Sequence, residues 1–159
     1  AYPHGNKILA TLEPRDSQYS AFVDSDVLFL RRNRPRALIS PGRVSCSVAA
    51  SMQWGEQTVW DEIYGVFGMP VPSERVRLMR RSRHKVVPYF SSGLVVFPEG
   101  PVNGARFADV WYETATEIDR KTDLPARRPY LDQMLRRQTG SGWIGNLREP
   151  VVEAGGVDD

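Results

Sequence analysis

The feature that most constrains this chain is a pair of acids between two short apolar stretches. Asp24 and Asp26 stand one residue apart, directly after residues 21–23 and before the apolar residues 27–30. A short apolar run is typical of a buried strand, and carboxylates at its end are costly unless they have partners or bind a cation. Ligands of open α/β sheets bind beyond the carboxyl ends of strands. The pair therefore predicts a site for a hard divalent cation held by carboxylates and substrate phosphates, although such pairs also cap helices and turns.

The size and composition of the chain limit the classes of protein to which it can belong. Its 159 residues suffice for one domain with a core, and no apolar stretch reaches the length of a membrane span. The single cysteine, Cys46, leaves no internal disulfide framework. With no visible secretory signal, this favours a reducing, cytoplasmic location.

The net charge of +2 conceals clusters of basic residues within 31–36 and 75–85. Such clusters attract phosphates, acidic lipids or nucleic acid. No aromatic residues alternate with them as they do on a single-strand binding platform. We therefore expect mostly solvated surfaces and no nucleic-acid binding.

Hydrophobic periodicity predicts helices and strands that alternate in one mixed α/β domain. The predicted helices cover residues 6–12, 54–67 and 105–121, and a further helix starts near Tyr130. In the first, Ile8, Leu9 and Leu12 are expected to share one face, and in the second, Trp60, Ile63, Tyr64 and Phe67 form an apolar stripe. The predicted strands cover residues 19–23, 44–50, 86–89 and 94–97. We expect the domain to span residues 1–148 and residues 149–159 to form a disordered tail.

Four motifs then follow one another in the chain: Gly5-Asn6-Lys7, Phe22-Val23-Asp24-Ser25-Asp26, Tyr89-Phe90-Ser91-Ser92-Gly93 and Leu131-Asp132-Gln133. In this order they resemble the GT-A glycosyltransferases, especially the glycosyltransferase-8-like members. The resemblance implies a mixed sheet with flanking helices, as part of a GT-A fold.

The resemblance also implies a chemistry, namely metal-dependent transfer of a sugar from a nucleotide-diphosphate donor by a hexosyltransferase-type enzyme. Asp26 would bind Mn²⁺ or Mg²⁺ directly, and Asp24 would bind the metal or the ribose side of the nucleotide. The cation would neutralise charge on the departing diphosphate. Lys7 would contact phosphate as a point charge, although a solvent-facing lysine in the first turn of a helix is an equal alternative. The acceptor, whether glycan, lipid or small molecule, is not indicated.

The later motifs match the sugar side of such a site. Ser91, Ser92 and Gly93 match a segment that lines the donor-sugar pocket, with Ser91 where the family usually has Asn. The alternative is a bulge between two core strands, where glycine is common. Asp132 and Gln133 match the pair beside the sugar, with Asp132 as hydrogen-bond acceptor or base and Gln133 as stabiliser of positive charge at the anomeric carbon. The alternative for Asp132 is an acid in the first turn of a helix, where the helix dipole favours it, but together with the other motifs the pair favours the functional interpretation.

Two parts of the family pattern are missing from the sequence. GT-A domains normally begin with a strand and a small-residue turn that bind the nucleotide, and only five residues precede Asn6. The pattern also ends with a metal-binding histidine, whereas His4 and His84 both precede Asp132. We therefore expect the chain to correspond to the later part of such a domain.

Two other functions fit parts of the pattern. A haloacid-dehalogenase-like phosphatase also carries D-x-D after an apolar strand, with the first acid as nucleophile. That motif needs Thr or Val where Leu28 stands, and a later acidic pair, for which only Asp158 and Asp159 are available. A non-catalytic, transferase-like binding module is the other alternative.

Overall fold

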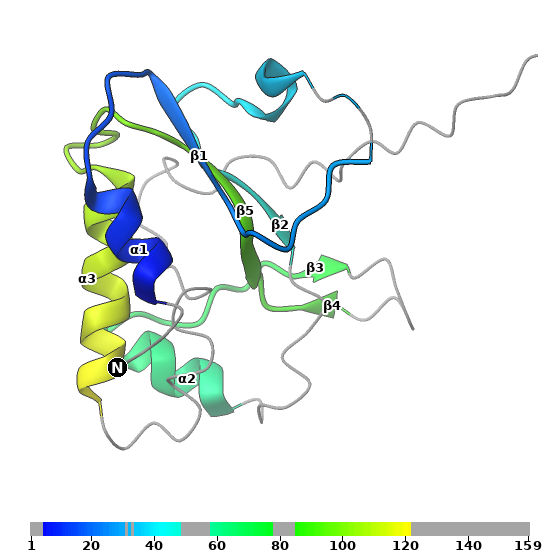
Figure 1. Cartoon of the computed structure of the whole chain (residues 1–159). Helices are drawn as coiled ribbons and strands as arrows, with labels where there is room; N and C mark the ends of the chain where they lie inside the picture. The colour runs from blue at the N-terminus through cyan, green and yellow to red at the C-terminus, as the bar shows by residue number, and fades with distance from the viewer. Residues whose placement is uncertain (1–4, 31, 33, 49–57, 78–84, 122–159) are drawn as a thin grey trace, which may run out of the picture.

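The computed structural model describes residues 5–30, 32, 34–48, 58–77 and 85–121 (Figure 1). Several predictions concern positions outside this range: the helix near Tyr130, the tail 149–159 and the residues Asp132, Gln133, His4 and His84.

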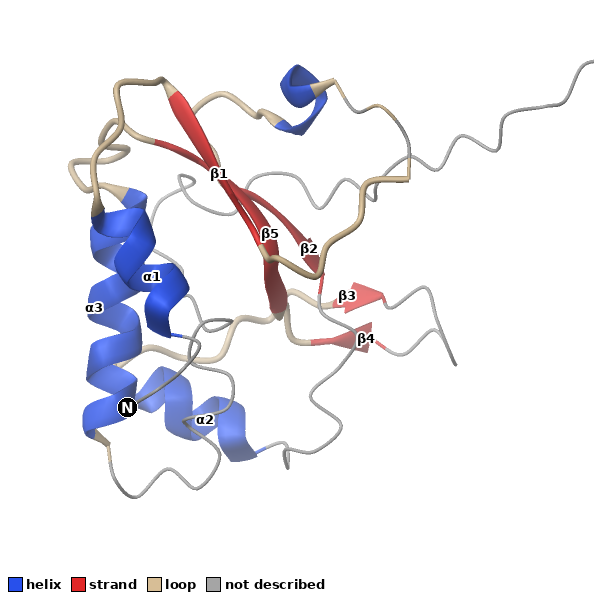
Figure 2. Ribbon diagram, viewed as in Figure 1, coloured by secondary structure: helices blue, strands red, loops and turns tan. Residues whose placement is uncertain are grey.

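The described elements combine helices and strands, which confirms the mixed α/β class, but the expected mixed sheet is wrong for the described residues because all their strand pairs are antiparallel. The strands β1 (Tyr19–Val23), β5 (Phe90–Pro98) and β2 (Ser45–Val48) form an antiparallel sheet in the order β1-β5-β2. The helices are α1 (Gly5–Leu12), α2 (Thr58–Gly65) and α3 (Phe107–Arg120). A short 3-10 helix, η1 (Pro35–Leu38), and a two-stranded pair, β3 (Val76–Arg77) with β4 (Lys85–Val86), complete them (Figure 2).

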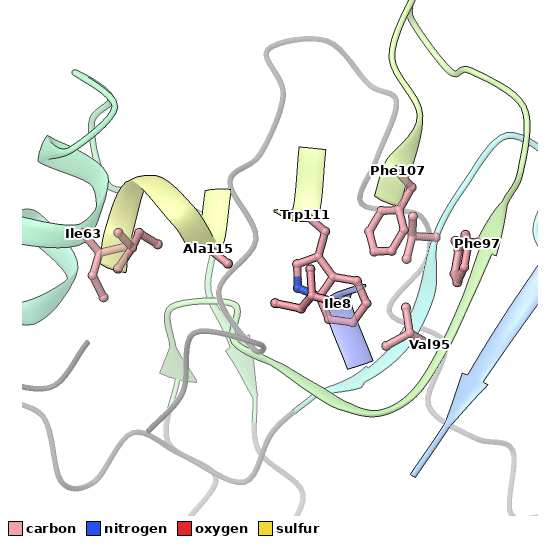
Figure 3. Packing of buried hydrophobic residues seen from close by; sticks show 9 residues of the cluster. Ile8, Ile63, Val95, Phe97, Phe107, Trp111 and Ala115 are labelled. Atoms are coloured by element: carbon pink, nitrogen blue, oxygen red, sulfur yellow. The ribbon is translucent and has the colours of Figure 1, made fainter. Parts of the chain in front are cut away.

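The core lies between the sheet and two helices that pack side by side, α1 and α3 (Figure 1). Trp111 of α3 is fully buried and lies near Ile8 of α1 in the middle of this cluster (Figure 3). The ring of Phe107 lies 5.4 Å from Trp111 and 5.1 Å from Phe97 of β5, centre to centre. Rings at such separations add to the burial of apolar area, so this contact fixes α3 against β5.

Helices α1 and α3 begin and end within two residues of the predicted positions, and α2 ends two residues before its predicted end. The predicted start of the second helix, at residue 54, lies outside the described residues. The predicted stripe is confirmed: in α2 Ile63 and Tyr64 are buried and Trp60 is partly buried, and Phe67, in the turn that follows α2, is partly buried as well. Gly68 has a φ of 62°, which ends this helical segment in the left-handed conformation that glycine adopts at little cost.

The first helix departs from its prediction in one residue. In α1 the side chain of Leu9 is 55% exposed, although Ile8, Leu9 and Leu12 were expected to share a buried face. Adjacent helix positions point about 100° apart, so only Ile8 of this neighbouring pair faces the core.

The prediction that β1 is a buried strand is wrong. Within the described residues β1 pairs only with β5 and is therefore an edge strand, and it alternates between buried and more exposed residues. Val23 at its end is 36% exposed. Antiparallel edge strands with one solvated face alternate in this way. The apolar residues that follow are also exposed, so the acid pair does not close a buried strand.

The segment 90–97 was predicted as an interruption followed by a strand, but it belongs to one continuous strand, β5. The irregularity lies instead in its pairing with β2, where Cys46 faces Val95 but Ser47 faces Ser91. A glycine within a strand often marks such a place. The bulge expected near Gly93 is thus a register break opposite Ser92, Gly93 and Leu94.

Candidate functional site

Three of the predicted site residues meet at one end of the β1–β5 pair. The Lys7 ammonium lies 2.9 Å from Asp24 Oδ1 and donates hydrogen bonds to Asp24 Oδ2 at 3.1 Å and to Ser92 Oγ at 3.1 Å. Lys7 comes from α1, Asp24 from the end of β1, and Ser92 from β5. The structure therefore brings together residues that lie 17 and 85 positions apart in the sequence.

The surroundings of Lys7 explain why its charge is held here. Its side chain is only 10% exposed, and its ammonium lies 5.6 Å from the centre of the Phe22 ring. A cation over an aromatic face is stabilised by the ring quadrupole, and the carboxylate of Asp24 neutralises the charge. The alternative of a solvent-facing lysine is excluded by this burial.

A tight turn carries the second acid. The amide of Val27 donates to the carbonyl of Asp24 at 3.1 Å, which closes a turn around Ser25 and Asp26. Asp26 is exposed on this turn and makes no ion pair within the described parts of the chain. One acid of the pair is thus ion-paired and half-buried, and the other faces solvent.

The backbone of Gly93 approaches the acid pair closely. The Gly93 carbonyl accepts a hydrogen bond from the Asp24 amide at 2.9 Å, and the Gly93 amide donates a hydrogen bond to Ser91 Oγ at 3.3 Å. A Cβ placed on Gly93 would lie 3.5 Å from both Asp24 Oδ2 and Ser91 Oγ. That is ordinary contact distance, so an alanine would fit but would fill the space between the two polar side chains.

The acid pair fits a metal ion only if most of the ligands come from elsewhere. Within the described residues, no three His, Cys, Asp or Glu side chains cluster in a way that could hold a metal ion. Mg²⁺ commonly binds through one or two carboxylates, with substrate phosphates and water as its other ligands. Exposed Asp26, with Asp24 beside it, meets that requirement.

Sequence reasoning missed a second polar cluster at the opposite end of the β1–β5 pair. Glu99 directly follows β5, and its side chain is 6% exposed. Arg106 Nη2 lies 3.3 Å and Arg15 Nη1 lies 3.6 Å from its carboxylate, and Ser20 donates a hydrogen bond to it. Arg106 also donates to the Leu12 carbonyl at 3.4 Å, so this cluster joins α1, β1, β5 and the start of α3.

A signal for this second cluster was present in the sequence. An acid directly after an apolar run is the pattern that drew attention to Asp24, and Glu99 follows Leu94–Pro98 in the same way.

The cysteine is not a reactive group. Cys46 lies on β2 and packs against the core cluster, and burial raises the pKa of its thiol to about 12. The nucleophilic form of cysteine is the thiolate, so the Cys46 thiol stays protonated and unreactive at neutral pH.

The structure thus gathers Lys7, Asp24, Ser92 and Gly93, and places Asp26 on the adjoining turn. Ser91 joins this group through its hydrogen bond with Gly93. The roles expected for these residues stay predictions, as do those of Asp132 and Gln133.

Comparison with known proteins identifies the family of the chain. A family model described as a Rhodobacterales glycosyltransferase domain matches residues 1–135. No curated protein and no solved structure matches the chain. None of the helices in the described ranges is long and apolar enough to cross a membrane.

Proposed function

The chain belongs to the family of Rhodobacterales glycosyltransferase domains, and on this premise we propose that it moves a sugar from a nucleotide-diphosphate donor with the aid of Mn²⁺ or Mg²⁺. The family gives the chain a glycosyltransferase role. The donor class, the cation and a GT-A arrangement of the site are the finer parts of the proposal.

One observation carries the proposal: Lys7, Asp24 and Ser92 converge beside the turn that presents Asp26. A diphosphate needs positive charge around it, and a sugar needs short polar groups. Lys7 supplies a fixed cation that Asp24 and the buried Ser92 hydroxyl hold in place. Ser91 supplies a hydroxyl, and Gly93 places no side chain between Ser91 and Asp24. This is the set of groups that such a donor requires.

The two acids take different parts in this proposal. Both carboxylate oxygens of Asp24 lie within 3.1 Å of the Lys7 ammonium, so Asp24 is already partly neutralised. Asp26 has no such partner among the described residues, and it is therefore the direct ligand of the cation. When bound, the cation supplies Lewis-acid stabilisation of the leaving diphosphate.

The chain's own residues hold the donor in place. Asp24 keeps Lys7 oriented, and Lys7 in turn ties α1 to the ends of β1 and β5. Asp132 and Gln133, by their resemblance to the family pair, act on the sugar. By that resemblance, Asp132 would accept hydrogen bonds from sugar hydroxyls or serve as base, and Gln133 would stabilise positive charge at the anomeric carbon through its carbonyl oxygen.

A titration with UDP and GDP, with Mn²⁺ and with EDTA, tests the proposal. We expect the chain to bind one of the two nucleotides, and only with Mn²⁺ present. The variant Asp26→Asn should keep the fold and bind that nucleotide at least about tenfold more weakly. Asp16→Asn is the matched control, because Asp16 is also exposed but precedes β1. Equal affinities for the two variants, or binding unaffected by EDTA, would refute the assignment of Asp26.

Turnover separates a transferase from a binding module. A transferase releases the nucleotide diphosphate from a UDP- or GDP-sugar, to water or to an acceptor, and does so only with the metal present. Metal-dependent binding without any release over long incubation would favour the binding module. Release of phosphate from a simple phosphomonoester would favour the phosphatase.

A further inference from the structure

Four successive apolar side chains are exposed directly after the acid pair. Residues 27–30 have no regular secondary structure, and Leu28 and Leu30 are 78% and 86% exposed. Val27 and Phe29 are exposed as well. Single exposed apolar residues are ordinary on protein surfaces, whereas an exposed run of four indicates a surface that binds something.

Basic residues continue this run. Arg32, Arg34 and Arg36 are all exposed, and none of them makes an ion pair within the described part of the chain. No acidic residue occurs between positions 27 and 38. The segment therefore joins an apolar half to a half with uncompensated positive charge.

We propose that residues 27–30 together with Arg32, Arg34 and Arg36 form a docking surface for a bilayer that contains anionic lipids. Apolar side chains partition into the boundary between headgroups and acyl chains, and neighbouring basic side chains bind the anionic headgroups. An extended, exposed segment suits a bilayer, because lipid offers no fixed pocket that the segment must match.

The charge pattern argues against the other occupants. A symmetric dimer through this surface would bring the arginines of both copies into one interface, and like charges gathered there are destabilising. Nucleic acid would satisfy the arginines but would leave the leucines without a partner, because stacking on bases needs aromatic rings. Only a surface that is both apolar and anionic satisfies both halves.

The position of the segment is compatible with docking. In Figure 1 the chain leaves the end of β1 and runs toward η1 on the side of the sheet away from α1 and α3. A bilayer can therefore meet this segment without displacing the helices of the core. The proposal concerns a surface and does not depend on the identity of the sugar donor.

Flotation with vesicles tests the apolar half of the surface. We expect the full chain to bind vesicles of phosphatidylcholine mixed with phosphatidylglycerol, and the double variant Leu28→Ser/Leu30→Ser to bind at least about tenfold more weakly. Leu9→Ser is the matched control, because Leu9 is an exposed leucine on α1. Absence of binding by the unmodified chain, or equal losses in the control, would overturn the proposal.

Lipid composition tests the basic half. Replacing Arg32, Arg34 and Arg36 by glutamine should weaken binding to the mixed vesicles by about a hundredfold and should remove the preference over pure phosphatidylcholine. Arg120→Gln, on the exposed end of α3, should change neither the affinity for mixed vesicles nor the preference for them over pure phosphatidylcholine. Equal binding to both vesicle types by the unmodified chain contradicts the proposal.

Two further outcomes would identify a different occupant. Concentration-dependent self-association that Leu28→Ser/Leu30→Ser abolishes, without vesicle binding, would show that a second copy covers the surface. Tight binding to single-stranded RNA that survives the leucine changes would show a nucleic-acid surface. Either result would replace the bilayer.

Discussion

The two ends of the β1–β5 pair each carry an acid that follows a strand, and the two acids are held differently. At one end Glu99 is almost fully buried and lies between two arginines and a serine. At the other end the side chain of Asp24 is 29% exposed and has one cation, Lys7. An acid surrounded by partners and removed from water is suited to joining elements, whereas a partly exposed acid next to an exposed turn can still meet a ligand.

The comparison teaches that the same sequence signal has two physical outcomes. A carboxylate at the end of an apolar run needs compensation, and arginines close by in the fold provide it for Glu99. A second acid one residue away on an exposed turn is what distinguishes the Asp24 end. The predictions below test this difference and run from the largest expected effect on stability to the smallest.

Loss of the Glu99 charge should have the largest effect on stability. Glu99→Gln leaves Arg106 without its buried partner, so the free energy of unfolding should fall by about 3 kcal/mol. Urea denaturation measures it, with Glu117→Gln as control, because the half-exposed Glu117–Arg120 pair should contribute only about 0.5 kcal/mol. Similar losses for both variants would remove the structural distinction between Glu99 and a surface acid.

Loss of the Lys7 charge should act mainly on binding. Lys7→Met keeps much of the apolar part of the side chain, and water can hydrate the partly exposed Asp24. The free energy of unfolding should therefore fall by only about 1 kcal/mol. Affinity for the nucleotide diphosphate should fall about tenfold, because the fixed cation beside the diphosphate is lost. Lys7→Arg should restore part of that affinity. A large loss of stability with unchanged affinity would make Lys7 a purely structural residue, like Arg106.

Cys46 lies between the two ends and provides a test that depends on pH. Its pKa is raised from 9.0 to about 12 in the folded state, so above pH 9 the unfolded chain loses the thiol proton that the folded chain keeps. Stability should therefore fall as the pH rises, by about 1 kcal/mol from pH 9 to pH 10. Urea denaturation of Cys46→Ala should not show this loss of stability between pH 9 and pH 10. Identical pH dependence in the two proteins would contradict the burial of the thiol.

Glycine substitutions should show the smallest effects on stability and still separate the two ends. Neither Gly93 nor Gly100 has a positive φ, and an added Cβ meets nothing at Gly100 and only ordinary contacts at Gly93. The free energy of unfolding of both Gly→Ala variants should stay within about 0.5 kcal/mol of that of the unmodified chain. Gly93→Ala should nevertheless weaken nucleotide-sugar binding severalfold, since its methyl group fills the space beside Asp24. An equal effect of Gly100→Ala on binding would contradict the proposed position of the donor.

Local patterns predicted most of the described elements. The strand 19–23 has the predicted bounds, and the stripe of Trp60, Ile63, Tyr64 and Phe67 predicted the buried face of α2. Such patterns are encoded over one or two turns, so the sequence shows them directly. The edge position of β1 among the described strands depends on which strands pair with it, and no local pattern contains that information.

The candidate site was predictable only in part, because contacts between elements distant in the sequence leave no local pattern. The motifs indicated Lys7, Asp24 and Ser92 individually, but the ion pair that joins them results from packing α1 beside β1 and β5. Glu99 was missed because its partner Arg106 carried no motif. Burial of Glu99 follows from the fold and not from its neighbours in sequence.

The central claim is that the Asp24 end of the β1–β5 pair receives the metal and the nucleotide, while the Glu99 end only joins elements. Line broadening of backbone amide signals by paramagnetic Mn²⁺, added with UDP or GDP, tests it directly. We predict that broadening is strongest at Asp24, Asp26 and Gly93 and decreases along β1 and β5 toward Ser20 and Gly100. Broadening centred on Glu99, or spread evenly over the exposed acids of the surface, would contradict the account.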